Sequence, residues 1–137
     1  MLVASEGRGP DGTGPLTQTV LDFVQTMSGL VPTARTPADW APLAPFVEVD
    51  DFQRVGTFRE RQSWSEYLEM LTRWAAATTR FETTVHRMSE VARLVYYEIE
   101  ERHTRADRVH TVNSLTVFEF TETGKIRRLN VYLQEGR

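Results

Sequence analysis

Proton transfer is the chemistry that the sequence offers most directly, beginning with one carboxylate. Asp51 comes shortly before the run Phe58–Trp64, which begins and ends with an aromatic residue. A carboxylate walled by aromatic side chains would have a raised pKa and could move a proton next to a carbonyl group. Asp51 could instead be a surface carboxylate beside Asp50, or a structural partner of Arg59 or Arg61.

Two histidines are candidate partners of that carboxylate. His110 falls on the mixed apolar and polar face of a predicted strand, opposite Glu101, which would orient its ring for acid or base catalysis. His110 could equally be an exposed residue at a strand end. His86 points toward or away from the same space, depending on which residue of Ser89–Glu90 centres the following turn. His103, beside another turn, is expected to be solvated.

Other kinds of catalytic site find no support in the residues. The chain has no cysteine, which excludes disulfides, a thiol nucleophile and thiolate metal ligands. Its three histidines lack the spacing of a metal site, and neither a glycine-rich phosphate loop nor a nucleophile elbow is present. We therefore expect chemistry without a metal or a cofactor.

The composition is that of an ordinary globular domain. The chain has 137 residues, 40% of them hydrophobic and 26% charged. We expect a flexible leader over residues 1–15 and a single domain over residues 16–137. The net charge of −3 argues against a nucleic-acid partner. No apolar run approaches the roughly 18 residues that a bilayer requires, so we expect no membrane contact and a cytoplasmic location.

The elements that must position these residues are helices first and strands afterwards, which predicts an α+β fold. Apolar residues at helical spacing predict a helix from Leu16 to Met27. Capping-box patterns predict a short helix from Thr36 and a longer one from Ser63. Alternation predicts a strand over 46–55, and then strands over about 80–88, 92–103, 109–121 and 125–134.

The faces of the long strands follow from requiring paired strands to agree. With a turn centred between Arg105 and Ala106, Ile99 lies opposite Val112 and shares a mostly apolar face with His110. In a curved sheet this face would line a cavity next to the helices. The opposite face carries Glu98, Glu100 and Asn113.

The order of elements and the closing strands resemble the SnoaL-like branch of the nuclear transport factor two-like superfamily. The resemblance covers roughly residues 16–134, and its most specific part is Val117–Ile126, followed by Val131-Tyr132. It implies a cone-shaped curved antiparallel sheet around about three N-terminal helices, enclosing a pocket. It also implies that the outer face of the sheet serves as a homodimer interface.

The resemblance places Asp51 where the ketosteroid isomerases carry their base, and His86 where dehydratases carry a histidine. Several other enzyme residues are missing: Thr116 stands where isomerases have an oxyanion-binding acid, and Val131 stands where epoxide hydrolases have an acid. The residues expected to line the pocket and bind a substrate are Trp64, Tyr67, Tyr97, Ser114, Thr116, Phe118 and Val131.

Two principal functions are compatible with the sequence. The first is a cofactor-independent enzyme of the cyclase, isomerase or dehydratase kind, which acts on a hydrophobic, oxygenated, polyketide-like substrate. The second is a non-catalytic module that binds a small hydrophobic ligand or dimerises with the same fold. A protein-interaction subunit that acts through the outer sheet face is a further possibility.

Overall fold

The computed structural model describes residues 14–136, in which helices precede most of the strands. The predicted leader lies outside the described residues, apart from its last two. No helix among residues 14–136 has the length and the apolar character to cross a membrane. The elements, in chain order, are α1 (Pro15–Leu30), η2 (Pro37–Phe46), η3 (Val49–Asp51), β1 (Gln53–Val55), β2 (Arg61–Gln62), α2 (Trp64–Ala77), β3 (Arg80–Val91), β4 (Leu94–Arg105), β5 (Arg108–Phe120) and β6 (Ile126–Glu135).

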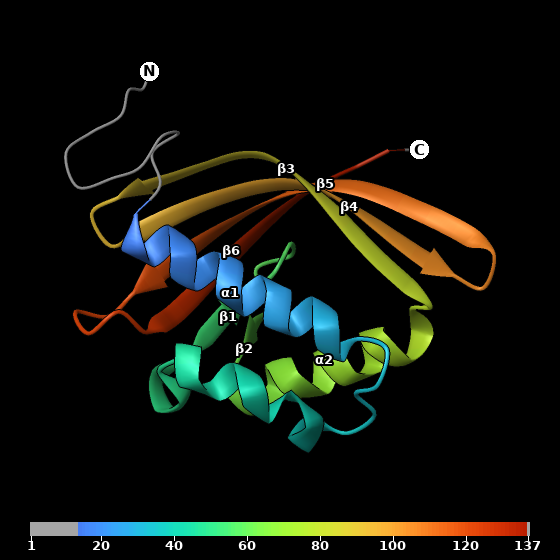
Figure 1. Cartoon of the computed structure of the whole chain (residues 1–137), viewed down its shortest axis with the longest axis horizontal. Coiled ribbons are helices and arrows are strands. Elements are labelled where there is room, and N and C mark those ends of the chain that lie inside the picture. Colours follow the sequence, from blue (N-terminus) through green and yellow to red (C-terminus); the bar gives the residue numbers. More distant parts are fainter. Residues whose placement is uncertain (1–13, 137) are drawn as a thin grey trace.

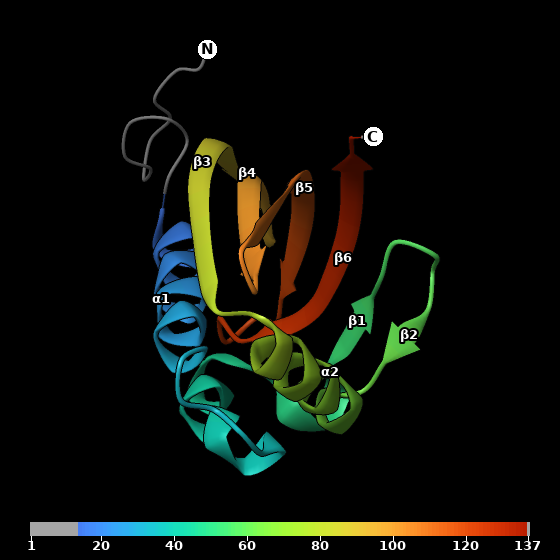
Figure 2. The same cartoon turned by 90° about the vertical axis from the view of Figure 1, so that its right-hand side faces the viewer.

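One curved six-stranded sheet forms the wall of the molecule, in the order β2-β1-β6-β5-β4-β3. Strand β1 runs parallel to β6, and all other neighbours are antiparallel. Figures 1 and 2 show α1 beside β3 and α2 below the curved sheet, so that the helices close one side of it. The predicted α+β cone is therefore confirmed, with one parallel pair at its short edge.

The two capping boxes form as predicted. Ser63 Oγ accepts a hydrogen bond from the Glu66 backbone N–H, and Glu66 Oε1 accepts one from the Ser63 N–H at 2.8 Å. At Thr36, which begins the 3₁₀ helix η2, the backbone N–H donates to Asp39 Oδ2 at 3.0 Å, and the Asp39 N–H donates to the Thr36 carbonyl at 3.0 Å. Pro42 and Pro45 lie inside η2, where a proline removes a donor that an α-helix would use.

The first predicted strand is mostly wrong. Residues 49–51 form the 3₁₀ turn η3, in which the Asp51 N–H donates to the Glu48 carbonyl at 3.1 Å. Only Gln53–Val55 pairs as a strand. Asp51 therefore lies in a turn and not on a strand that faces the helices.

The pairing of β4 with β5 differs from the prediction by two residues. Ile99 pairs with Ser114, because the chain turns through Ala106 and Asp107 rather than between Arg105 and Ala106. Ala106 adopts a φ of 54°, in the left-handed region of the backbone map. Alanine rarely adopts this conformation, so the sequence does not indicate a turn centred after it. Since side chains alternate with a period of two, this shift leaves every residue on its predicted face.

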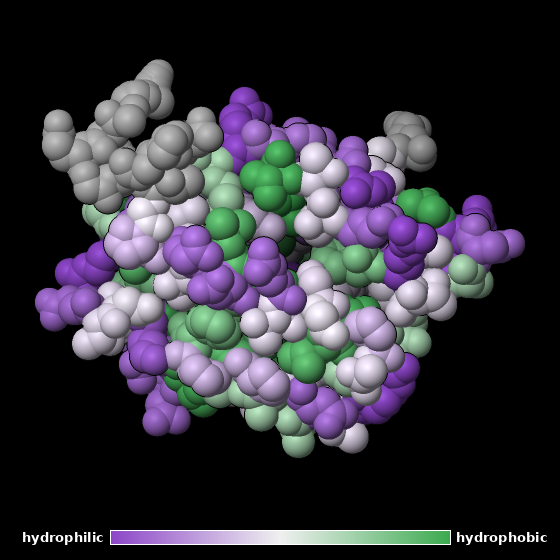
Figure 3. Space-filling model, viewed as in Figure 1, coloured by the Kyte–Doolittle hydropathy of each residue, from purple (hydrophilic) through white to green (hydrophobic). Residues whose placement is uncertain are grey.

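The core joins the helices to the concave face of the sheet. Phe23 of α1 packs edge-on against Phe46 and Phe118, with ring centroids 6.3 and 6.2 Å away. Trp40 and Leu43 of η2 are fully buried beneath them. On the face drawn in Figure 3, hydrophobic residues are scattered among hydrophilic ones.

A buried carboxyl group fixes the start of α1 to the end of β3. Both the backbone N–H and the hydroxyl of Thr17 donate to Glu90 Oε1, each at 2.9 Å. Thr17 is 1% exposed and Glu90 8%. A Cβ at Gly14 would lie 2.8 Å from the same oxygen, so glycine lets the carboxyl group approach the helix end. This contact holds α1 over the sheet edge.

Replacement of Thr17 by valine tests this contact. The variant keeps the shape and the backbone N–H but loses the hydroxyl donor, so we expect the free energy of unfolding to fall by about 1–2 kcal/mol in urea denaturation. Thr19→Val is the matched control, because the Thr19 hydroxyl donates only to the exposed Pro15 carbonyl at 3.2 Å. Equal losses in the two variants would contradict a special role for the Thr17 hydroxyl.

Candidate functional site

A cavity of about 830 Å³ lies between the concave sheet face and helices α1 and α2. Most of its wall is apolar. The apolar lining includes Leu21, Val24, Met27, Met70, Leu71, Phe81, Ile99, Leu129 and Leu133. Polar groups are fewer and occupy particular places on the wall, an arrangement typical of small-molecule sites.

Glu101 is the central polar group of this cavity. It lies on the concave face of β4, and its side chain is 20% exposed. His103 Nε2 lies 2.8 Å from its Oε1, and the Ser114 hydroxyl donates to its Oε2 at 2.5 Å. An ionised carboxylate has about four lone-pair positions, so each oxygen can still accept another hydrogen bond.

Trp74 determines which nitrogen of His103 carries the proton. The indole Nε1 lies 2.9 Å from His103 Nδ1 and can only donate, so Nδ1 must accept and carries no proton. The ring proton is therefore on Nε2 and points at Glu101. The contact between His103 and Glu101 is consequently a hydrogen bond from a neutral ring, which orients the carboxylate.

The pKa of Glu101 reflects two opposing influences. Burial raises the pKa, since the cavity wall solvates a charge poorly, whereas the hydrogen bonds from His103 and Ser114 lower it. The charge of Arg54 lowers it further, and together these effects bring the pKa of Glu101 below its ordinary value. Glu101 is therefore ionised at neutral pH, in an otherwise apolar space.

Three hydroxyl groups lie in the same wall. Burial raises the pKa of the Tyr67 hydroxyl well above its usual range, and this hydroxyl has no hydrogen-bond partner among residues 14–136. Burial and the charge of Glu101 raise the pKa of Tyr97, which a hydrogen bond with Thr83 partly offsets. Thr116 adds a third hydroxyl beside Tyr97 in the ladder. All three stay protonated and can donate to a ligand.

The structure brings most of the predicted lining residues together. Tyr67, Tyr97, Thr116, Phe118 and Val131 border the cavity. Ser114 and Trp64 do not. Ser114 lies behind Glu101 and donates to it, whereas Trp64 packs against Phe52 and Tyr67, with centroids 5.1 and 5.9 Å away.

Asp51 does not lie at the cavity. Its side chain is 64% exposed, and its Oδ2 is 3.3 Å from Nη2 of Arg127 on β6. Neither Arg59 nor Arg61, the alternative partners that the sequence suggested, pairs with it. Asp51 therefore takes part in an ion pair at the surface and is not a buried base.

The histidine that reaches the carboxylate is not the predicted one. His110 lies on the cavity face but is exposed at the rim, opposite His103 instead of Glu101, with ring centroids 6.5 Å apart. His103 is 14% exposed and not solvated as expected. The spacing of Glu101 and His103, two residues apart on one strand, was the signal that could have identified the pair.

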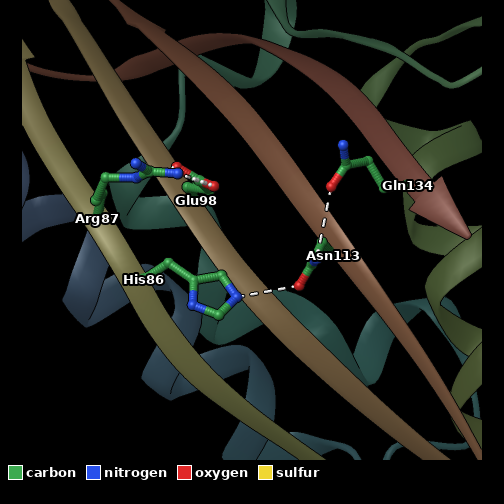
Figure 4. A network of polar contacts seen from close by, with 5 residues as sticks. All are labelled: His86, Arg87, Glu98, Asn113 and Gln134. Atoms are coloured by element: carbon green, nitrogen blue, oxygen red, sulfur yellow. Dashed lines mark hydrogen bonds and ion pairs between the residues drawn. The ribbon is translucent and has the colours of Figure 1, made fainter.

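His86 lies on the outer face of the sheet. A β-bulge between Val85 and Arg87 places His86 and Arg87 on the same side, which decides between the two predicted orientations. In Figure 4, His86 Nε2 lies 3.0 Å from Asn113 Oδ1, and Arg87 forms a bidentate pair with Glu98 at 2.6 and 2.7 Å. His86 therefore belongs to a surface network that also includes Gln134.

Metal ligands are not assembled in this part of the chain. No group of three or more histidine, cysteine or acidic side chains among residues 14–136 could hold an ion. Around Glu101, the cavity wall also offers hydroxyl groups and the guanidinium of Arg54 to a ligand.

Comparison with known proteins identifies the fold. No protein-family model and no curated protein matches the chain. An NTF2-like protein from Anabaena variabilis is 13% identical, covers 87% of this chain and 89% of its own, and superposes with a TM-score of 0.70. The chain has the NTF2-like cone fold. A SnoaL-like protein from Jannaschia sp. CCS1 is 10% identical, the match covers 95% of this chain and 92% of that one, and the TM-score is 0.67.

Another similar structure is an LEH-like epoxide hydrolase from M. tuberculosis. It is 17% identical over 88% of this chain and 86% of its own, with a TM-score of 0.64. At these identities the neighbours share the NTF2-like architecture, which hosts more than one activity. The residues that decide the chemistry must therefore come from this chain.

The hydrogen-bonded row from Trp74 to Glu101 predicts a specific spectrum for His103. In a long-range ¹H–¹⁵N correlation at neutral pH, Nδ1 should show the shift of an unprotonated nitrogen and Nε2 that of a protonated one. Trp74→Phe should weaken this preference, because it removes the indole donor to Nδ1 and leaves only the Glu101 carboxylate to hold the proton on Nε2.

Trp64→Phe is the control for that experiment. Trp64 makes ring contacts but no hydrogen bond to His103, so its replacement should leave the His103 signals unchanged. A protonated Nδ1 in the unaltered protein would contradict the assigned tautomer.

Proposed function

We propose that this chain is a small-molecule enzyme that moves a proton on a hydrophobic, oxygenated substrate, with Glu101 as the base. The proposal rests on one observation: a carboxylate held by two hydrogen bonds in the wall of an apolar cavity. The proposed step uses no cofactor. Glu101 takes the role that the sequence suggested for Asp51, and we assign no step to Asp51 or His86.

The proposed reaction is proton transfer next to a carbonyl group. A carbon–hydrogen bond gives its proton to Glu101, and the electron pair of that bond moves toward the carbonyl oxygen to form an enolate. Glu101 then returns the proton to another carbon, as in an isomerase, or to a departing hydroxyl group, as in a dehydratase. A carboxylate with a lowered pKa is a weak base, so the reacting carbon–hydrogen bond must be acidic.

The surrounding groups suit this step. Tyr67, Tyr97 and Thr116 offer hydroxyl donors from different parts of the wall, and such donors stabilise an enolate oxygen best where water is excluded. His103 and Ser114 act as positioning residues, since both hold Glu101 and neither is needed to touch the substrate.

A non-catalytic ligand-binding module is the second candidate. The observation in its favour is that both oxygens of Glu101 already accept hydrogen bonds, which makes it a better acceptor for a ligand hydroxyl than a base. Two expectations from the sequence stay predictions under either function. One is a homodimer that forms through the outer face, which carries Glu98, Glu100 and Asn113, and the other is a cytoplasmic location.

Hydrogen–deuterium exchange tests the enzyme proposal without knowledge of the natural substrate. 2-Tetralone is an apolar bicyclic ketone with an acidic carbon–hydrogen bond, and its exchange in D₂O can be followed by proton NMR. The protein should accelerate exchange, and Glu101→Gln should lower the protein-dependent rate about a hundredfold or more. Because the pKa of Glu101 is lowered, this rate should stay level between about pH 6 and pH 8.

Glu100→Gln is the matched control, since Glu100 neighbours Glu101 on β4 but pairs with Arg102 on the outer face. Its exchange rate should equal that of the unaltered protein. Binding of 2-tetralone without accelerated exchange would favour the ligand-binding module. Equal acceleration by the Glu101→Gln variant would exclude Glu101 as the base.

A further inference from the structure

We infer that Arg54 is a specificity-determining residue that selects ligands with an anionic oxygen, which names a substrate class for the proposed proton-transfer site. This inference rests on the proposed function because it concerns the same cavity. Its evidence comes from other residues, which surround Arg54 and not Glu101. The ligand class is a hydrophobic molecule that carries one carboxylate or one acidic enol or phenol.

Arg54 is positioned by the short edge of the sheet. It lies on β1, paired with Leu129 of β6 on one side and with Gln62 of β2 on the other. Its side chain is 14% exposed and borders the cavity. A guanidinium group is thus placed in a wall that is otherwise largely apolar.

Most of the donors of Arg54 are unused. Nη1 donates to Gln62 Oε1 at 3.0 Å and lies 3.7 Å from Glu60 Oε2. Nε and Nη2 have no hydrogen-bond partner among residues 14–136. A guanidinium presents donors in a planar fork that fits two oxygens of a carboxylate, and such charge-assisted bonds are strong where solvent is scarce.

The local packing keeps this arginine in place. A Cβ at Gly56 would lie 2.0 Å from Glu60 Oε2 and 2.9 Å from Arg54 Nη1, so the glycine makes room for both groups. The pair with Glu60 is long, and Glu60 is 47% exposed, so this carboxylate neutralises the arginine only in part. The hydrogen bond that Arg54 Nη1 donates to Gln62 Oε1 holds one end of the guanidinium and leaves the other end available.

The two charges of the cavity are separate. Arg54 acts on the pKa of both Tyr67 and Glu101 through its charge, so it lies within electrostatic reach of both. No ion pair joins Arg54 to Glu101 in the described residues. A ligand can therefore place an anionic oxygen at Arg54 and a proton-bearing carbon or hydroxyl at Glu101, while its apolar body fills the space between them.

Two naphthalene compounds of nearly equal shape test the charge preference by isothermal titration calorimetry on the full chain. 2-Naphthoate carries the anion, and 2-naphthamide is its neutral counterpart. The unaltered protein should bind 2-naphthoate more tightly. Arg54→Gln should weaken 2-naphthoate binding roughly tenfold to a hundredfold and change 2-naphthamide binding about twofold at most.

Glu60→Gln provides a change in the opposite direction that leaves Arg54 intact. It removes the competing carboxylate, so 2-naphthoate should bind about twofold to fivefold more tightly. This variant keeps the inference testable if Arg54→Gln does not fold.

The inference would be overturned if Arg54→Gln weakened the binding of both compounds equally. It would also be overturned if Glu60→Gln did not bind 2-naphthoate more tightly than the unaltered protein. Tighter binding of 2-naphthamide by the unaltered protein would do the same. The proton-transfer proposal would survive those results if 2-tetralone exchange still required Glu101. If neither naphthalene compound binds and the protein does not accelerate 2-tetralone exchange, both the Arg54 inference and the proton-transfer proposal are contradicted.

Discussion

A carboxylate kept ionised inside an apolar cavity is the constraint on which the rest of this structure depends. Removal of Glu101 from water is costly unless hydrogen bonds replace those lost, and His103 and Ser114 supply them. Trp74 donates to the other ring nitrogen of His103, so this hydrogen bond connects α2 to β4 of the sheet. The cone therefore holds the carboxylate in one orientation instead of merely enclosing it.

The overall architecture could be predicted from the sequence because it follows from periodic patterns. Alternation on β4 and β5 assigned the concave face correctly, and the capping box at Ser63 located α2. Both signals are local and repeated over many residues. The pairing of Ile99 was wrong by two residues, because the turn depends on a left-handed Ala106 that composition does not announce.

The candidate site was harder to predict, because it depends on single residues. Asp51 was chosen by its place relative to α2, but a 3₁₀ turn carries it to the surface, where Arg127 binds it. His86 was displaced by a bulge that no turn signal marks. Glu101 and His103 were on the right face, yet their roles depend on Trp74, which lies 29 residues before His103 in another element. Contacts of that kind are set by tertiary packing.

Hydrogen bonds and the charge of Arg54 together outweigh burial at Glu101, and a carbon-13 NMR titration of the Glu101 side-chain carboxyl group tests this balance. The titration requires the full chain and an assignment by comparison with Glu101→Gln. The midpoint of the Glu101 titration should lie below the ordinary value of 4.5. A midpoint above 4.5 would mean that burial prevails and that Glu101 keeps its proton nearer to neutral pH, which would contradict an ionised carboxylate held by His103 and Ser114.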